Sequence, residues 1–305
     1  MKLVSFRNKK DAPFRIGVLL DTNKVLDLQD ASKQMRLESG EAVEEFPVNP
    51  DSFYKVGLKA VKGAKLVVDY VLSNQIKSLQ YDRDEIELGT PISRPGKIIC
   101  VGKNYAEHAA EMNSDVPDHP VLFAKFANAL IGPEEVIVKN PLTNKLDYEA
   151  ELTIVIGKEA SCVHKEDATD YILGYTIGND ISARDLQKRT PQWLQGKTLD
   201  RSTPVGPWVV TKEAVTDPAN LAIRSFVNGE ERQSSNTKHL IFDIPYLIEF
   251  ISSIMTLEAG DIILTGTPSG VGLAMDPPGF LNDGDTVTVE IESIGKLENK
   301  VESRR

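Results

Sequence analysis

The segment LDYEAELTIVI, residues 146–156, is the part of the chain on which both the fold and a candidate site depend. Side chains of a β-strand alternate between two faces, so Glu149 and Glu151 point to one side and the apolar residues of 150–156 form the other. Neighbouring carboxylates repel each other unless a cation lies between them, and oxygen ligands favour magnesium, manganese or calcium over zinc. On this motif alone a metal-binding strand stays open beside a solvent-facing pair, which is the commoner arrangement.

Strand-like segments surround this one, and turns rich in Gly, Pro, Asn and Asp separate them. They cover residues 97–101, 171–178, 206–210, 222–227, 261–264 and 286–292. One long helix is predicted behind the cap Asp243, because apolar residues from 244 to 255 recur at helical spacing and Pro245 is tolerated in a first turn. Many strands, few helices and no regular alternation of the two predict a mainly β architecture with some α.

The front of the chain differs from the rest. Short strands are predicted at residues 2–6, 14–20 and 24–28, followed by a helical stretch over 52–73. Gly89, Pro91 and Pro95 then interrupt the pattern. We therefore predict a small α+β N-terminal domain at 1–94, without a chemical motif, and a catalytic domain at 95–305.

Composition excludes several classes of protein. The chain has 305 residues, 41% of them hydrophobic, and a net charge of -10, which argues against a nucleic-acid partner. Apolar runs fall short of the roughly 20 residues that span a bilayer, and the first residues do not form a signal-peptide core, so we expect a cytoplasmic protein without a membrane partner. Cys100 and Cys162 are expected to be buried free thiols.

Asp180 lies where the strand predicted at 171–178 gives way to a loop, which is where sites are commonly built. A third carboxylate could there join Glu149 and Glu151. Taken alone, Asp180 is more simply a cap of the following turn.

A histidine and a glutamate form a second candidate feature. His108 and Glu111 are three residues apart, so in a helix they share a face, and the carboxylate could orient and charge-stabilise the imidazole. This is an acid–base pair in outline. An exposed His–Glu pair on a helix surface is the alternative, and spacing alone favours it.

A glycine-rich loop follows the strand predicted at 261–264. Its sequence TGTPSGVG, residues 265–272, could offer amides and hydroxyls to a carboxylate. It does not have the Gly-Lys-Ser/Thr of a nucleotide-binding P-loop. The glycines could equally serve only to form turns.

The order of these motifs resembles the fumarylacetoacetate hydrolase family over about residues 95 to 295. The resemblance is carried by NYxxHxxE (104–111), PVLFxK (120–125), DYExE (147–151), GNDxSARDxQ (178–187), Lys197 and TGTPxGVG (265–272). The small front domain is similar to that of bacterial two-part members. The resemblance implies a mixed β-roll catalytic domain and a homodimer.

It also implies roles for individual residues. Glu149, Glu151 and Asp180 would hold Mg²⁺ or Mn²⁺, with Ca²⁺ possible. His108, oriented by Glu111, would be the general base on a segment that closes as a lid. The remaining implied roles are Lys197 for charge on the developing oxyanion and Lys125, Gln187, Thr267 and Tyr105 for holding substrate.

The implied activity is metal-dependent hydrolysis of a carbon–carbon bond in a small 2-oxo or 1,3-dioxo acid of the fumarylacetoacetate or acylpyruvate type, through a metal-stabilised enolate. Members with the same site include oxaloacetate decarboxylases or tautomerases and isomerase–decarboxylases of aromatic catabolism, and the sequence does not separate these reactions. A non-catalytic member that binds a metabolite or protein is the alternative from another class.

Overall fold

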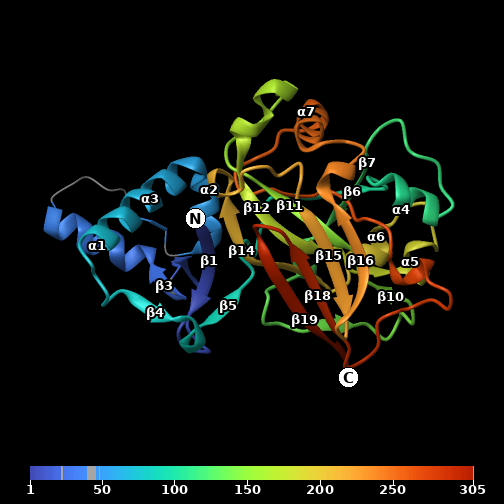
Figure 1. The fold of residues 1–305 in the computed structure, drawn as a ribbon, viewed down its shortest axis with the longest axis horizontal. Helices are drawn as coiled ribbons and strands as arrows, with labels where there is room; N and C mark the ends of the chain where they lie inside the picture. The colour runs from blue at the N-terminus through green and yellow to red at the C-terminus, as the bar shows by residue number, and fades with distance from the viewer. Residues whose placement is uncertain (22, 40–45, 48, 305) are drawn as a thin grey trace.

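The computed structural model describes residues 1–21, 23–39, 46–47 and 49–304 (Figure 1). A 12-stranded sheet in the order β4-β3-β2-β1-β14-β12-β11-β17-β6-β7, with β5 on β1 and β8 on β14, forms its centre. Its strands are β1 Lys2–Arg7, β2 Arg15–Leu19, β3 Lys24–Asp27, β4 Gln80–Asp82, β5 Glu87–Gly89, β6 Ile98–Gly102, β7 Val121–Lys125, β8 Leu130–Ile131, β11 Ala150–Ile156, β12 Ile172–Asn179, β14 Thr203–Thr211 and β17 Ile262–Leu264.

Two smaller sheets complete the β structure. One has five strands in the order β16-β15-β18-β19-β9, and the other pairs β10 with β13. Their bounds are β9 Ile137–Lys139, β15 Ala222–Val227, β16 Glu230–Asn236, β18 Thr286–Ile291, β19 Gly295–Ser303, β10 Leu146–Asp147 and β13 Ser182–Ala183. The predicted class, mainly β with some α, is confirmed.

Helices lie mostly outside the sheets, and α1 to α3 gather at the N-terminal side (Figure 1). The α-helices are α1 Leu28–Ser39, α2 Pro50–Val56, α3 Leu58–Ser73, α4 Ala106–Glu111, α5 Arg184–Gln187, α6 Leu194–Lys197 and α7 Ile244–Ile254. Segments of 3-10 helix span Arg83–Glu85, Ala127–Ala129, Lys165–Tyr171, Lys212–Ala214, Thr237–His239 and Gly272–Ala274. Helix α7 begins as predicted, because the Asp243 carboxylate accepts the Tyr246 N–H at 2.9 Å.

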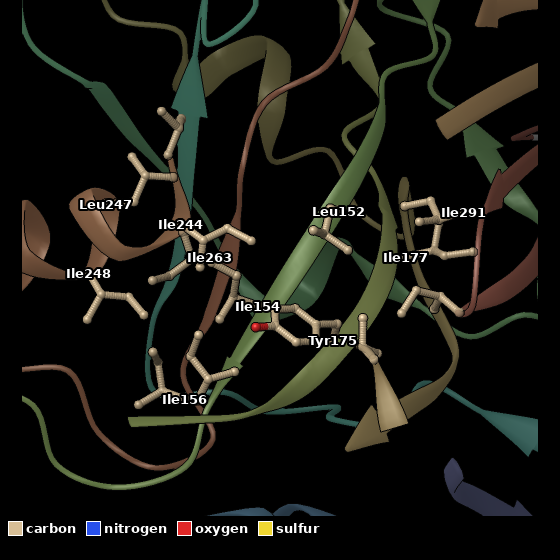
Figure 2. Close-up of a cluster of buried hydrophobic side chains, with 14 of the residues drawn as sticks. Leu152, Ile154, Ile156, Tyr175, Ile177, Ile244, Leu247, Ile248, Ile263 and Ile291 are labelled. Carbon is tan, nitrogen blue, oxygen red and sulfur yellow. The ribbon is translucent and has the colours of Figure 1, made fainter. Parts of the chain in front are cut away.

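Strand β11 is the centre of the core, and the alternation predicted for it is confirmed. Leu152, Ile154 and Ile156 pack with Tyr175 and Ile177 of β12 (Figure 2). The same cluster includes Ile244, Leu247 and Ile248 of α7, Ile263 of β17 and Ile291 of β18. Because every residue of β11 is buried, the strand is enclosed on both faces and a half-exposed strand is ruled out.

The front strands agree with their predicted ranges, but the predicted helix over 52–73 is two helices. Gly57 separates α2 from α3 with φ 71°, and a Cβ at Gly57 would lie 2.0 Å from the carbonyl oxygen of Gly157. Helix α1 was not predicted. Strand β1 pairs with β14, so the front strands extend the main sheet, and the domain boundary near residue 94 stays a prediction.

Cysteine burial was predicted correctly at one position of two. Cys100 is buried in β6, whereas Cys162 is exposed. Cys162 lies in a turn with φ 49°, where the chain leaves the sheet and turns its side chain to solvent. Both thiols are free, as expected. Within the part of the chain that the structure describes, no helix has the length and apolar character needed to cross a membrane.

Candidate metal centre and acid–base pair

Three carboxylates from two antiparallel strands meet at one point. Glu151 belongs to β11 and Glu149 precedes it, while Asp180 follows the adjacent strand β12, whose Asn179 is opposite Ala150. One carboxylate oxygen of each lies within 4.8 Å of the others. Glu149, Glu151 and Asp180 are 5%, 2% and 0% exposed, so the solvent-facing alternative is wrong.

Buried cations surround these carboxylates. The Lys197 ammonium lies 2.6 Å from Glu149 Oε2 and 2.6 Å from Asp180 Oδ2. Lys125 Nζ donates to Asp180 Oδ1 at 2.6 Å. Lys197 ends the short helix α6, with its ammonium 4.9 Å from the centre of the Phe123 ring. Lys125 is predicted to hold substrate, and here its ammonium contacts a carboxylate of the protein.

Arg184 and Asp147 also belong to this cluster, and sequence reasoning gave them no role. Arg184 Nε donates to Asp147 Oδ2 at 2.8 Å, and Arg184 Nη2 forms an ion pair with Glu149 Oε1 at 2.7 Å. Asp147 Oδ1 accepts the Gly272 N–H at 2.7 Å, and its other oxygen accepts the Leu273 N–H at 3.0 Å. Both side chains stood inside motifs quoted above, but opposite charges 37 residues apart do not reveal their pairing in a sequence.

The electrostatics of the centre fit a cation. Burial, together with repulsion from Asp180 and Glu149, raises the pKa of Glu151 well above its usual value. Burial also works against ionisation of Glu149, but Lys197 and Arg184 outweigh it and lower the pKa of Glu149. Glu151 is therefore a buried carboxylate short of positive charge, which a divalent ion held by all three oxygen donors would supply. Such an ion would share Glu149 and Asp180 with the Lys197 ammonium.

The predicted His–Glu pair forms on α4. His108 Nδ1 lies 2.7 Å from Glu111 Oε1, and Glu111 Oε2 accepts the Gly270 N–H at 2.9 Å. His108 is 6% exposed, so an exposed surface pair is ruled out. With the Nδ1 proton directed at a carboxylate, Nε2 is the nitrogen that can accept a proton.

The glycine-rich loop binds carboxylates of the protein itself. The Gly266 N–H donates to Glu151 Oε2 at 2.7 Å, as Gly270 and Gly272 do to Glu111 and Asp147. Gly266 has φ 105°, and a Cβ there would lie 2.7 Å from the Cβ of Asn104. These three amides therefore donate to carboxylates of the site and not to a bound anion.

A cavity of about 60 Å³ joins the centre to the acid–base pair. Its lining includes Lys103, His108, Phe123, Glu149, Glu151, Arg184, Gln187, Trp193, Lys197 and Thr267. Cavities of about 880 and 420 Å³ lie elsewhere, but they lack the clustered carboxylates and the histidine, so chemistry places the site in the small one.

The predicted substrate-binding residues differ in where they lie. Thr267 and Gln187 line the cavity, where Thr267 Oγ1 accepts from Gln233 at 2.7 Å and Gln187 Oε1 accepts from Arg184 at 3.2 Å. Tyr105 lies just before α4, and its buried hydroxyl finds no hydrogen-bond partner among the described residues. Their contacts with substrate stay predictions.

Buried carboxylates beside an oriented histidine form a candidate metal and acid–base centre, and comparisons with known proteins give the family. Residues 97–302 match the model described as "Fumarylacetoacetate (FAA) hydrolase C-terminal". The chain belongs to the fumarylacetoacetate hydrolase family, as its motifs suggested.

Among relatives, the "Oxaloacetate tautomerase YisK" of Bacillus subtilis is 43% identical over 94% of this chain and 95% of its own. The structure of "Fumarylacetoacetate hydrolase (EaFAH)" from Exiguobacterium antarcticum is similar with a TM-score of 0.79 and 38% identity, covering 100% of both chains. Maleylpyruvate hydrolase from Sphingobium sp. SYK-6, solved with manganese(II) and pyruvate, gives a TM-score of 0.78 at 29% identity, again over 100% of both chains.

These findings establish an enzyme family that acts on small oxo acids. The acidic triad and the manganese-bound relative together indicate a divalent metal. The particular ion, the homodimer and the cytoplasmic location stay predictions.

Proposed function

We propose that this protein is a divalent-metal-dependent tautomerase of a small 2-oxo acid of the oxaloacetate type, interconverting its enol and keto forms. The observation that carries the proposal is that His108, paired with Glu111 at 2.7 Å, lines the same cavity as Glu149 and Glu151 of the carboxylate triad. Relatives named oxaloacetate tautomerase, at 43% and 42% identity over nearly the whole chain, support this reaction above the others in the family.

Glu149, Glu151 and Asp180 would hold the metal. When bound, Mg²⁺ or Mn²⁺ supplies Lewis-acid stabilisation of charge on the carboxylate and 2-oxo oxygens of the substrate. The remaining chemistry belongs to the side chains of the protein.

Tautomerisation requires the enol hydroxyl to lose a proton, which neutral His108 Nε2 can accept, and C3 to gain one, which the resulting imidazolium can donate. His108 Nε2 is the group we assign to proton transfer at C3, since Glu111 fixes the orientation of the imidazole through Nδ1. Lys197 is assigned to the negative charge that develops on the substrate oxygen. Burial works against the charge of Lys197, but Asp180 and Glu149 outweigh it and raise its pKa, which favours the ammonium form.

The size of the cavity is a further support. About 60 Å³ gives room for a few water molecules, so the lining must open to admit even a four-carbon acid. Proton transfer within an enclosed enolate needs no water, whereas hydrolysis does.

The test is to mix the metal-loaded protein with enol-rich oxaloacetate and follow loss of the enol absorbance, with pyruvate measured in parallel. We expect accelerated ketonisation without matching pyruvate formation. Pyruvate release at the rate of enol loss would show decarboxylation instead, and no acceleration with any divalent metal would refute the proposal.

Hydrolysis of a carbon–carbon bond is the second candidate, favoured by the structural neighbours named as hydrolases. There His108 would deprotonate water for attack on a distal carbonyl, and Lys197 would face the resulting oxyanion. Turnover of acetylpyruvate or fumarylpyruvate faster than that of enol-oxaloacetate would favour it. A solely binding role is less well supported, since both the triad and the acid–base pair are intact.

A further inference from the structure

The cations that line the cavity differ in whether a carboxylate of the protein pairs with them. Lys197 and Arg184 each contact protein carboxylates, and Lys125, just beyond the lining, does the same. Lys103 lines the same cavity, but the hydrogen bond recorded for its ammonium goes to a neutral hydroxyl, Ser114 Oγ, at 2.5 Å. Among the described cations that line this cavity, Lys103 therefore stands apart in having no carboxylate partner.

The backbone at Lys103 has an unusual conformation, and the residue after it is held in place. It follows β6 directly and has φ 56°, a left-handed conformation that is uncommon outside glycine and concentrates at functional sites. The next residue, Asn104, is fixed by a hydrogen bond from its side chain to the Thr265 carbonyl at 2.8 Å. Lys103 thus sits on an anchored segment, at the wall of the cavity that also carries His108.

We infer that Lys103 determines specificity by binding the second carboxylate of a dicarboxylate substrate, the one remote from the metal. The inference rests on the proposed function and narrows its substrate class to 2-oxo dicarboxylates. A charge-assisted bond between ammonium and carboxylate is stronger than a bond to a neutral hydroxyl, so the substrate would displace Ser114. Ser114 Oγ also donates to the Asp115 carbonyl at 3.3 Å, so its hydroxyl keeps a partner when Lys103 leaves.

The experiment measures binding as well as turnover. Manganese-loaded wild type, Lys103→Met, Lys103→Arg and Ser114→Ala are titrated by calorimetry with 3,3-difluorooxaloacetate, a dicarboxylate that cannot enolise at C3, and with oxalate, which lacks the remote carboxylate. We expect Lys103→Met to weaken difluorooxaloacetate binding at least about tenfold, as loss of a hydrogen bond between charged groups predicts, and to leave oxalate binding within about twofold. Lys103→Arg should restore most of the affinity.

Ser114→Ala tests whether affinity for the dicarboxylate depends on the Lys103 ammonium itself or on its bond to Ser114. It removes the Lys103–Ser114 bond but keeps the ammonium, so dicarboxylate affinity should stay near wild type. Equal weakening of oxalate and difluorooxaloacetate in Lys103→Met, or wild-type affinity for both, would overturn the inference. So would a wild type that binds 2-oxobutyrate, whose methyl group replaces the remote carboxylate, as tightly as difluorooxaloacetate.

Failure of the proposed function is distinguishable from failure of this inference. A wild type that does not accelerate ketonisation refutes the tautomerase, whereas the difference between the two ligands in Lys103→Met does not depend on turnover. If turnover is present, Lys103→Met should raise KM for oxaloacetate with a smaller effect on kcat.

Discussion

The floor and the wall of the site are built differently. The floor is a set of buried charges on long strands, where Glu149 and Asp180 each contact cations of the protein. The wall is α4, a six-residue helix whose cap Tyr105 makes no side-chain capping bond. Left-handed residues stand on either side of it, Lys103 with φ 56° and Asn113 with φ 52°. On the proposed function, metal binding would belong to a part of the fold held by several buried ion pairs, and proton transfer to a short helix.

The largest effect is expected from the floor. Glu149→Gln should abolish activity through lost metal binding, and chelation of wild type should do so reversibly. Gln is a better test than Ala because it fills the same space beside the buried Lys197 and Arg184. Metal binding is measured by calorimetry, folding by circular dichroism, and Glu159→Gln at an exposed turn is the control. Full activity in a metal-stripped sample would show that the activity does not need a metal at these carboxylates.

His108→Ala tests whether floor and wall have separate tasks. We expect kcat to fall by about 10²-fold or more, the usual effect of losing a positioned general base, while metal affinity is unchanged. Steady-state kinetics with manganese titration measures both, and exposed His164→Ala is the control. Loss of metal in His108→Ala would show that this histidine is a metal ligand. Floor and wall would then not have separate tasks.

Lys197→Met should lower kcat by at least about tenfold with little change in KM, because the charge that Lys197 stabilises grows toward the transition state. Since its ammonium also contacts Glu149 and Asp180, metal affinity is measured in parallel and is expected to persist. Lys188→Met, at an exposed position nearby, should behave as wild type. Equal rates in the two variants would remove Lys197 from the mechanism.

The smallest effect concerns motion of the wall. Without ligand, amides from 105 to about 117 should exchange hydrogen faster than those of β11, since the segment has few apolar anchors. Their exchange should slow when oxalate and metal bind. Hydrogen exchange with mass spectrometry compares the free and bound protein. Exchange in this segment that oxalate leaves unaltered would indicate a fixed wall.

Local patterns predicted the parts of the structure that neighbours in the chain control. Alternation along 150–156 identified the buried face of β11, and Asp243 was recognised as the cap of α7. The strands β16 and β19 were not predicted, because EERQSSN and GKLENKVES are polar segments that become strands only by pairing with β15 and β18.

The sequence by itself placed Glu149 beside Glu151 and His108 beside Glu111, since strand alternation and helical spacing are local properties. Their roles as metal ligands and acid–base pair, and that of Asp180, came from the resemblance of the motif order. The tertiary structure decided the rest. Pairing of β11 with β12 brought Asp180 to Glu149 and Glu151, and burial turned nearby charges into the contacts of Arg184 with Asp147 and Glu149. Such contacts join residues far apart in the chain and exclude water, so their partners and strength exist only once the sheet has formed.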